Sequence, residues 1–258
     1  HLLRSGVATA AECQAWDDEV TAVWATVLGR SFDQHQRAQL FLPIRHGGGG
    51  FQSAEWRRAP AVLGSWALCL QQIAFPLGFR SVLDFRTACP FVVSAIDAAC
   101  RELGFDFVFD WVVYFDTAVR GKQKEIAREL HDVKARKLAL LLDEDDRIDL
   151  ASASGPGAGH FLLMPTLDSH RMPDEHFAVA LRRRFRFASP ARASPPTAPS
   201  HCNHRRRNGT ICGVQLDARG HHGATCEIGG LLEFGHDSIR DWLAGWITDV
   251  TGRKATTE

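Results

Sequence analysis

Cysteine and histidine residues concentrate between positions 201 and 226. Cys212 and Cys226 flank the pair His221 and His222 within a glycine-containing stretch. Thiolate and imidazole are the ligands of small structural zinc sites, which are tetrahedral and need four ligands. A loop of this length buries no core of its own, so metal ligation would supply its folding energy, about 10 kcal/mol for a complete site. The spacing predicts a zinc site that includes Cys212, His222 (or His221) and Cys226.

The fourth ligand must come from upstream, where His201, Cys202 and His204 lie close together. Cys202 is favoured because thiolate binds zinc best. The nine residues between Cys202 and Cys212 are also enough to close a loop. The alternative is that these are unrelated surface residues on a turn without metal. The predicted zinc ligands are Cys202, Cys212, His222 and Cys226.

The bulk composition is that of an ordinary folded protein. The chain has 258 residues, of which 45% are hydrophobic and 23% charged, enough for one sizeable core or two small ones. Four of the seven cysteines fall in apolar helical segments, and the odd count favours a reducing compartment over a disulfide framework. The sequence contains no run of eighteen apolar residues, so it predicts no membrane-spanning helix. Because the chain begins at His1 without a signal-peptide pattern, we expect it to be part of a longer protein.

The formal net charge of zero hides a basic segment. Residues 182–219 contain nine arginines and one acidic residue, Asp217. Such a block favours a polyanionic partner, although a solvated arginine face is the common alternative. Arginines at the end of a helix also complement its dipole, which weakens the inference for 182–184. The candidate nucleic-acid contacts are Arg182, Arg183, Arg184, Arg186, Arg205, Arg206 and Arg207.

The first quarter of the chain has strong helix signals. Apolar residues recur at helical spacing from Ala10 to Leu28, and Gly29 is placed to end that helix. Ser31, with Gln34 three residues later, predicts a capping box that starts a short helix to Leu40.

Four consecutive glycines, 47–50, then interrupt regular structure. They lack the Lys-Ser/Thr of a phosphate-binding loop, so a flexible turn is the favoured interpretation. Ser53 is expected to cap the next helix, which should kink near Pro60.

The rest of the chain completes a mainly α prediction. Residues 105–115 are aromatic and β-branched and fit either a strand or a buried helix. Four prolines within residues 188–200 indicate a semi-extended linker, and apolar residues of 236–250 fall on one helical face. Further helices are predicted at 90–103, 122–142 and 173–184. The predicted parts are a helical body (1–187), a Pro/Ser/Ala linker (188–200), a Cys/His knuckle (201–234) and an amphipathic helix (235–258).

Six phrases in this order resemble the C-terminal regions of non-LTR (LINE-like) retrotransposon reverse transcriptases. They cover nearly the whole chain. They are LPIRHGGGGFQSAEWRRAPAVLGSW at 42–66, the KQ-headed helix at 122, GPGAG before an apolar run at 155–163, EHFAVALRRRF at 175–185, the Cys-Gly, Leu-Asp, Gly-x-His, Cys knuckle with its Gly-Gly pair at 212–230, and the His-Asp helix at 236.

The sequence departs from the family pattern at two positions. The knuckle of that family has a second Cys where this chain has Thr210, and an Arg where this chain has Gly235. Cys202 or His204 could substitute for the missing ligand. The paired aspartates of the polymerase palm are also absent, since residues 114–117 read YFDT. The resemblance therefore implies the region between palm and endonuclease core, with neither active site.

The resemblance implies RNA or DNA as partner, an intracellular, nuclear location, and neither membrane nor small-molecule substrate. The alternative from another class is a helical interaction scaffold from a decayed element copy, without nucleic-acid binding. A hydrolase that uses His236 with Asp237 or Asp241 is disfavoured, because a helix-surface ion pair explains these residues and no nucleophile accompanies them.

Overall fold

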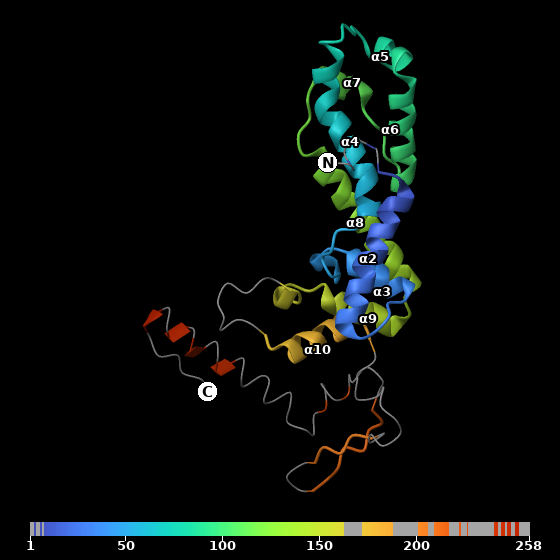
Figure 1. Ribbon diagram of the computed structural model, residues 1–258. Coiled ribbons are helices and arrows are strands. Elements are labelled where there is room, and N and C mark those ends of the chain that lie inside the picture. The colour runs from blue at the N-terminus through green and yellow to red at the C-terminus, as the bar shows by residue number, and fades with distance from the viewer. Residues whose placement is uncertain are drawn as a thin grey trace. The chain divides into compact units, whose positions relative to one another are not determined.

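The prediction of a mainly α fold is confirmed. The computed structural model (Figure 1) is helical through most of the residues that it describes. Among these residues, β-pairing is limited to two isolated antiparallel bridges. The chain divides into two compact units, His1–Phe185 and Arg186–Glu258. The described residues are 3, 6, 8–162, 172–187, 201–205, 209–216, 222, 226, 240, 241, 244, 245, 247, 248, 251 and 252.

The helices of the first unit follow one another with short connections. In chain order they are α2 (Ala10–Leu28), α3 (Gln34–Phe41), the 3-10 turn η1 (Ile44–His46), α4 (Ala54–Ala74), α5 (Val82–Ala88), α6 (Pro90–Leu103), α7 (Trp111–Asp116), α8 (Lys122–Leu141), α9 (Glu144–Ala153), η2 (His160–Leu162) and α10 (Asp174–Arg184).

Local capping chemistry explains where the first helices begin. Thr9 caps α2 in a capping box with Glu12, and Gly29 ends the helix in the left-handed conformation at φ 63°. The predicted start of α3 at Ser31 is wrong. Asp33 is the N-cap and Gln36 completes the box, because the chain reaches helical geometry only after Phe32, whose ring lies 5.6 Å from that of Phe185.

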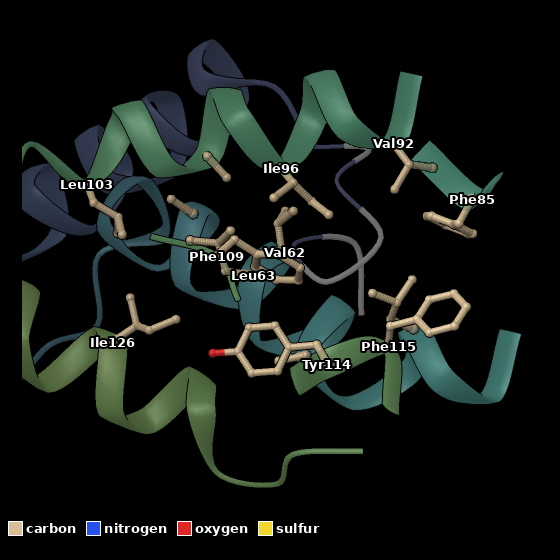
Figure 2. Packing of buried hydrophobic residues seen from close by; sticks show 14 of the residues in the cluster. Val62, Leu63, Phe85, Val92, Ile96, Leu103, Phe109, Tyr114, Phe115 and Ile126 are labelled. Atoms are coloured by element: carbon tan, nitrogen blue, oxygen red, sulfur yellow. The ribbon is translucent and has the colours of Figure 1, made fainter. Parts of the chain in front are cut away.

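Helix α4 forms the centre of the main core. Val62 and Leu63 of α4 face Ile96 and Leu103 of α6 in Figure 2, and all four are buried. Helices α5, α7 and α8 add the buried side chains of Phe85, Tyr114, Phe115, Ile126 and Leu130 to this cluster. Residues 105–115, expected to be either a strand or a buried helix, are not uniform. Residues 105–110 have no regular structure, and helix α7 starts at Trp111.

The glycine run is a packed turn, which corrects the expectation of a flexible one. Gly47, Gly48 and Gly49 are buried. A Cβ on Gly48 would lie 2.0 Å from the carbonyl oxygen of Leu42, so only glycine fits there. The turn places Ser53 at the start of α4, whose N-cap it is, as the sequence predicts.

Arg184 ties this turn to neighbouring segments of the first unit. Its guanidinium donates hydrogen bonds to the carbonyl oxygens of Ile44, Gly48, Ala153 and Ala158, at 2.9 to 3.1 Å. Burial lowers the pKa of Arg184, but a guanidinium remains charged in proteins. The position of α10 therefore depends on one buried cation that four carbonyl groups neutralise in part.

Candidate metal centre

Antiparallel pairing brings the two upstream cysteines together within the second unit. His201 pairs with Gln215, and Arg205 with Ile211. The amide of Cys202 donates to the carbonyl of Val214 at 2.7 Å, and the carbonyl of Cys202 accepts from the amide of Gly213 at 2.9 Å. The segment therefore folds back on itself, with Cys202 on one side and Cys212 on the other.

All four predicted ligands converge in this unit. One ligand atom from each of Cys202, Cys212, His222 and Cys226 lies within 4.8 Å of every other. The Sγ atoms of Cys202 and Cys226 are 3.6 Å apart, and Sγ of Cys212 lies 3.3 Å from Nε2 of His222. Metal–sulfur bonds of about 2.3 Å and metal–nitrogen bonds of about 2.0 Å at tetrahedral angles give ligand–ligand separations of about 3.5 to 3.8 Å. The two contacts match two edges of such a tetrahedron to within a few tenths of an ångström.

The electrostatics of the cluster favour a bound cation. A backbone hydrogen bond involving His204 lowers the pKa of Cys202, but burial and the thiols of Cys226 and Cys212 raise it, so the net shift is upward. The Cys202 thiol holds its proton more tightly than an isolated thiol in part because a thiolate there would be repelled by the neighbouring sulfur atoms. A divalent cation removes that repulsion, so metal binding would release protons.

The structure separates Cys202 from the alternative fourth ligands. Cys202 and Cys226 are buried at 4% and 1% exposure, whereas His201 is exposed on the outside of the antiparallel pair. His204 does not join the cluster, although its Nδ1 is buried. Alternation along the extended segment separates His201 from Cys202. His204 is two residues from Cys202 and on the same face, so alternation does not account for its exclusion from the cluster.

The candidate nucleic-acid arginines are not equivalent in the structure. Arg182 donates to the carbonyl of Leu28 at 2.8 and 3.1 Å, and Arg184 is fully engaged in carbonyl contacts. Arg186 is buried at 6% exposure. Arg183 and Arg205 are exposed. Arg206 and Arg207 lie outside the described residues.

The buried arginines therefore correct part of the sequence-based assignment. A guanidinium that donates to internal carbonyls, as Arg184 does, has no face left for phosphate. The sequence shows only a run of arginines at a helix end, and nothing in that pattern distinguishes a side chain that turns inward from one in solvent.

The residues of the hydrolase interpretation are only partly described. His236 and Asp237 lie outside the described residues, as does most of the predicted helix 236–250. Asp241 accepts hydrogen bonds from the neighbouring Arg240 at 2.9 and 3.1 Å. This is a surface ion pair, a kind of contact that contributes little to stability.

A basic cavity in the first unit was not anticipated from the sequence. It has a volume of about 940 Å³ and lies along α4 and α8. Lys124, Arg128 and His131 of α8 line it, and their spacing of four and three residues puts them on one helix face. The sequence shows this spacing, but it does not show which face of α8 is buried, so the cavity could not be predicted from it.

Comparison of the chain with protein families, with curated proteins and with solved structures found no match. Among the described helices, none combines the length and apolar character that crossing a bilayer requires.

Proposed function

We propose that this chain is a nucleic-acid-binding C-terminal portion of a non-LTR retrotransposon reverse transcriptase, without a polymerase or endonuclease site of its own. Residues 201–226 would form a zinc-stabilised module within it. The convergence of Cys202, Cys212, His222 and Cys226 supports this proposal most strongly. The order of six sequence phrases that resemble the same family supports it independently.

The donor set favours zinc over other cations. Three thiolates and one imidazole are soft ligands, and a tetrahedral S₃N set is typical of structural zinc. All four positions belong to protein side chains, so no position is open for water or substrate. The metal would therefore stabilise the fold of the second unit and take no part in catalysis.

The nucleic-acid role would use the arginines that remain in solvent. Arg183 and Arg205 are exposed. The sequence adds Arg206 and Arg207 next to Arg205. Contacts of this type bind phosphates and give affinity without reading sequence.

Metal analysis of the purified chain tests the zinc module. We expect one zinc per chain, and Cys212→Ser should lose it while the helical body keeps its circular dichroism. Cys69→Ser is the control, because Cys69 is a half-buried residue of α4, outside the cluster. Well under one zinc per chain in the parent protein would refute the module.

Retention of single-stranded RNA or DNA at low salt tests the nucleic-acid role. Binding should weaken steeply with salt, with a log–log slope of about −0.7 to −0.9 per phosphate contacted. Replacing Arg205, Arg206 and Arg207 together by Gln should weaken binding to all sequences alike and flatten that slope. No retention by the parent protein at low salt would leave the helical scaffold as the better description.

A further inference from the structure

Helices α4 and α8 run antiparallel and form the two walls of the basic cavity. Gly64 of α4 lies against Gln123 of α8 so closely that a Cβ on Gly64 would be 2.5 Å from Cβ of Gln123. Farther along the pair, Trp56 contacts the ring of His131 at 6.3 Å between centroids. Figure 1 shows both helices within the helical body. The groove between them, of about 940 Å³, therefore lies wholly in the first unit.

The charges around this groove have one sign. Four cations line it, Arg45, Arg57, Lys124 and Arg128, and none of the lining residues that the structure describes is acidic. Arg45 is paired with Asp132 at 3.1 Å. Arg57, Lys124 and Arg128 form no ion pair with another described residue. Three cations without an ion-pair partner among the described residues thus line the groove, and one of them, Arg128, also lines the neighbouring cavity.

His131, which also lines the groove, lies near the same positive charges. Burial lowers the pKa of His131, and the cations Arg45, His46 and Arg57 lower it further, whereas Asp132 opposes them. Clefts with one sign of charge and apolar walls concentrate the field and attract ions of opposite sign.

The neighbouring face of α8 provides an internal contrast. A second cavity, of about 660 Å³, shares Arg128 with the groove and is lined by the further cations Arg136 and Arg147, but also by Glu125, Glu129 and Asp132. The charges that line this second cavity are therefore mixed, whereas those that line the groove are all positive. A polyanion would be attracted to the α4–α8 groove and not to its neighbour.

Aromatic side chains and small polar groups complete the walls of the groove. Phe51 and Trp66 line it and are half-buried, so each presents part of its ring to the hollow. Gln52 and Ser65 supply neutral hydrogen-bonding groups beside them. Cations that follow a groove together with accessible rings are the combination that proteins use for single strands, because phosphates meet the cations and unpaired bases stack on the rings. An acidic peptide would use the cations but not the rings.

We propose that the groove between α4 and α8 binds single-stranded nucleic acid, with Arg57, Lys124 and Arg128 contacting phosphates and Phe51 and Trp66 contacting bases. This site rests on the nucleic-acid-binding role proposed above and deepens it, because it gives the strand a path in the helical body that does not involve the zinc module. It also explains how the chain could bind a strand although Arg182, Arg184 and Arg186 are engaged or buried.

The test uses the full chain and a fluorescent oligonucleotide without secondary structure, at about 50 mM salt. The variant Arg57→Gln/Lys124→Gln/Arg128→Gln should bind at least about tenfold more weakly and show a log–log salt slope smaller by about 2, which is three contacts at about 0.7 each. The matched control Arg136→Gln/Lys137→Gln/Arg147→Gln removes the same charge from α8 and α9 at residues that do not line the groove. It should bind like the parent. Phe51→Leu with Trp66→Leu should weaken binding with an unchanged salt slope.

The outcomes separate this proposal from the broader one. If the parent binds and the groove variant binds equally well with the parent's salt slope, the groove proposal is overturned while the nucleic-acid role stands. If the parent binds no strand at low salt, the role itself fails. If a poly-glutamate peptide competes as effectively as the oligonucleotide per charge, the groove recognises acidic chains in general, and the assignment to nucleic acid is wrong. Zinc content and urea denaturation of each variant establish that it is folded.

Discussion

Asp17 of α2 and Ser53, the N-cap of α4, are joined by a buried hydrogen bond from the Ser53 hydroxyl to the Asp17 carboxylate. The same carboxylate accepts the backbone N–H groups of Ala54 and Glu55, at 2.7 and 3.3 Å. These donors open the first turn of α4 and have no intrahelical partner. One side chain from α2 therefore satisfies the start of the central helix of the core.

Replacing Asp17 by Ala should destabilise the first unit by about 2–3 kcal/mol, because a cap is lost and buried donors are left without acceptors. Urea denaturation followed by far-ultraviolet circular dichroism measures the change. Asp18→Ala is the control, since Asp18 is exposed and pairs with Arg37 on the surface, where such pairs contribute less than about 1 kcal/mol. Equal effects of the two substitutions would contradict the capping role of Asp17.

Gly64→Ala tests the contact between α4 and α8. In most helix interiors this substitution stabilises by about 1 kcal/mol. Here the added Cβ would lie 2.7 Å from the backbone Cα of Gln123, so the helices must separate, at a cost of about 2 kcal/mol or more. Thermal denaturation gives the sign. Gly155→Ala, whose Cβ would meet nothing closer than 3.5 Å, should be close to neutral.

Arg184→Gln should cost about 3 kcal/mol or more, because the amide cannot reach four carbonyl oxygens and leaves buried acceptors unsatisfied. Arg183→Gln changes an exposed neighbour and should stay within about 0.5 kcal/mol of the parent. Equal urea midpoints for the two variants would show that the carbonyl contacts of Arg184 contribute little.

The choice of Cys202 as fourth metal ligand can be tested with Co²⁺, which absorbs strongly when thiolates bind it. Cys202→Ser should lose part of the sulfur-to-cobalt absorption and most of the metal affinity. His204→Ala should retain both, because His204 stands outside the cluster. The reverse pattern would make His204 the ligand.

Protonation of His131 should destabilise the first unit in acid. Burial and the cations Arg45, His46 and Arg57 hold its pKa below 6.5 in the folded chain, with Asp132 opposing them. The unfolded chain then binds more protons, so stability is lost as pH falls below about 6.5 and through the lower folded pKa. His131→Gln should reduce the difference between urea midpoints at pH 7 and pH 5. The exposed His176→Gln should leave it unchanged.

Strong local signals made the long helices predictable. The starts of α6 and α8 at Pro90 and Lys122 match the expected positions, since Pro fits a first turn and the apolar spacing of each helix is regular. Competing caps explain the error at α3, because Ser31 and Asp33 both have Gln three residues later and only the packing of Phe32 decides between them. The short helix α5 carries too few residues for a periodic pattern.

The metal cluster could be predicted from the sequence, whereas the roles of the arginines could not. Metal ligands are few, and their chemistry restricts them to Cys and His, so spacing alone identified the cluster. Arginine has both structural and binding roles, and the direction of its side chain depends on tertiary contacts. The inward turn of Arg184 follows from carbonyls at 44, 48, 153 and 158, which are far apart in sequence.

The contacts of Arg184 and Phe185 set the minimum length of an autonomous helical body. Gln39 donates to the carbonyl of Arg184 and Gln36 to that of Phe185, at 2.8 and 3.0 Å, and Phe185 itself is fully buried. A fragment that stops before residue 184 would expose the interior of α3. It would also remove the acceptor of the Gln36 amide and the guanidinium that donates to the Gly48 carbonyl. Expression boundaries placed just after residue 187 should therefore give protease-resistant protein, while a boundary only a few residues earlier should give a product that limited proteolysis degrades rapidly.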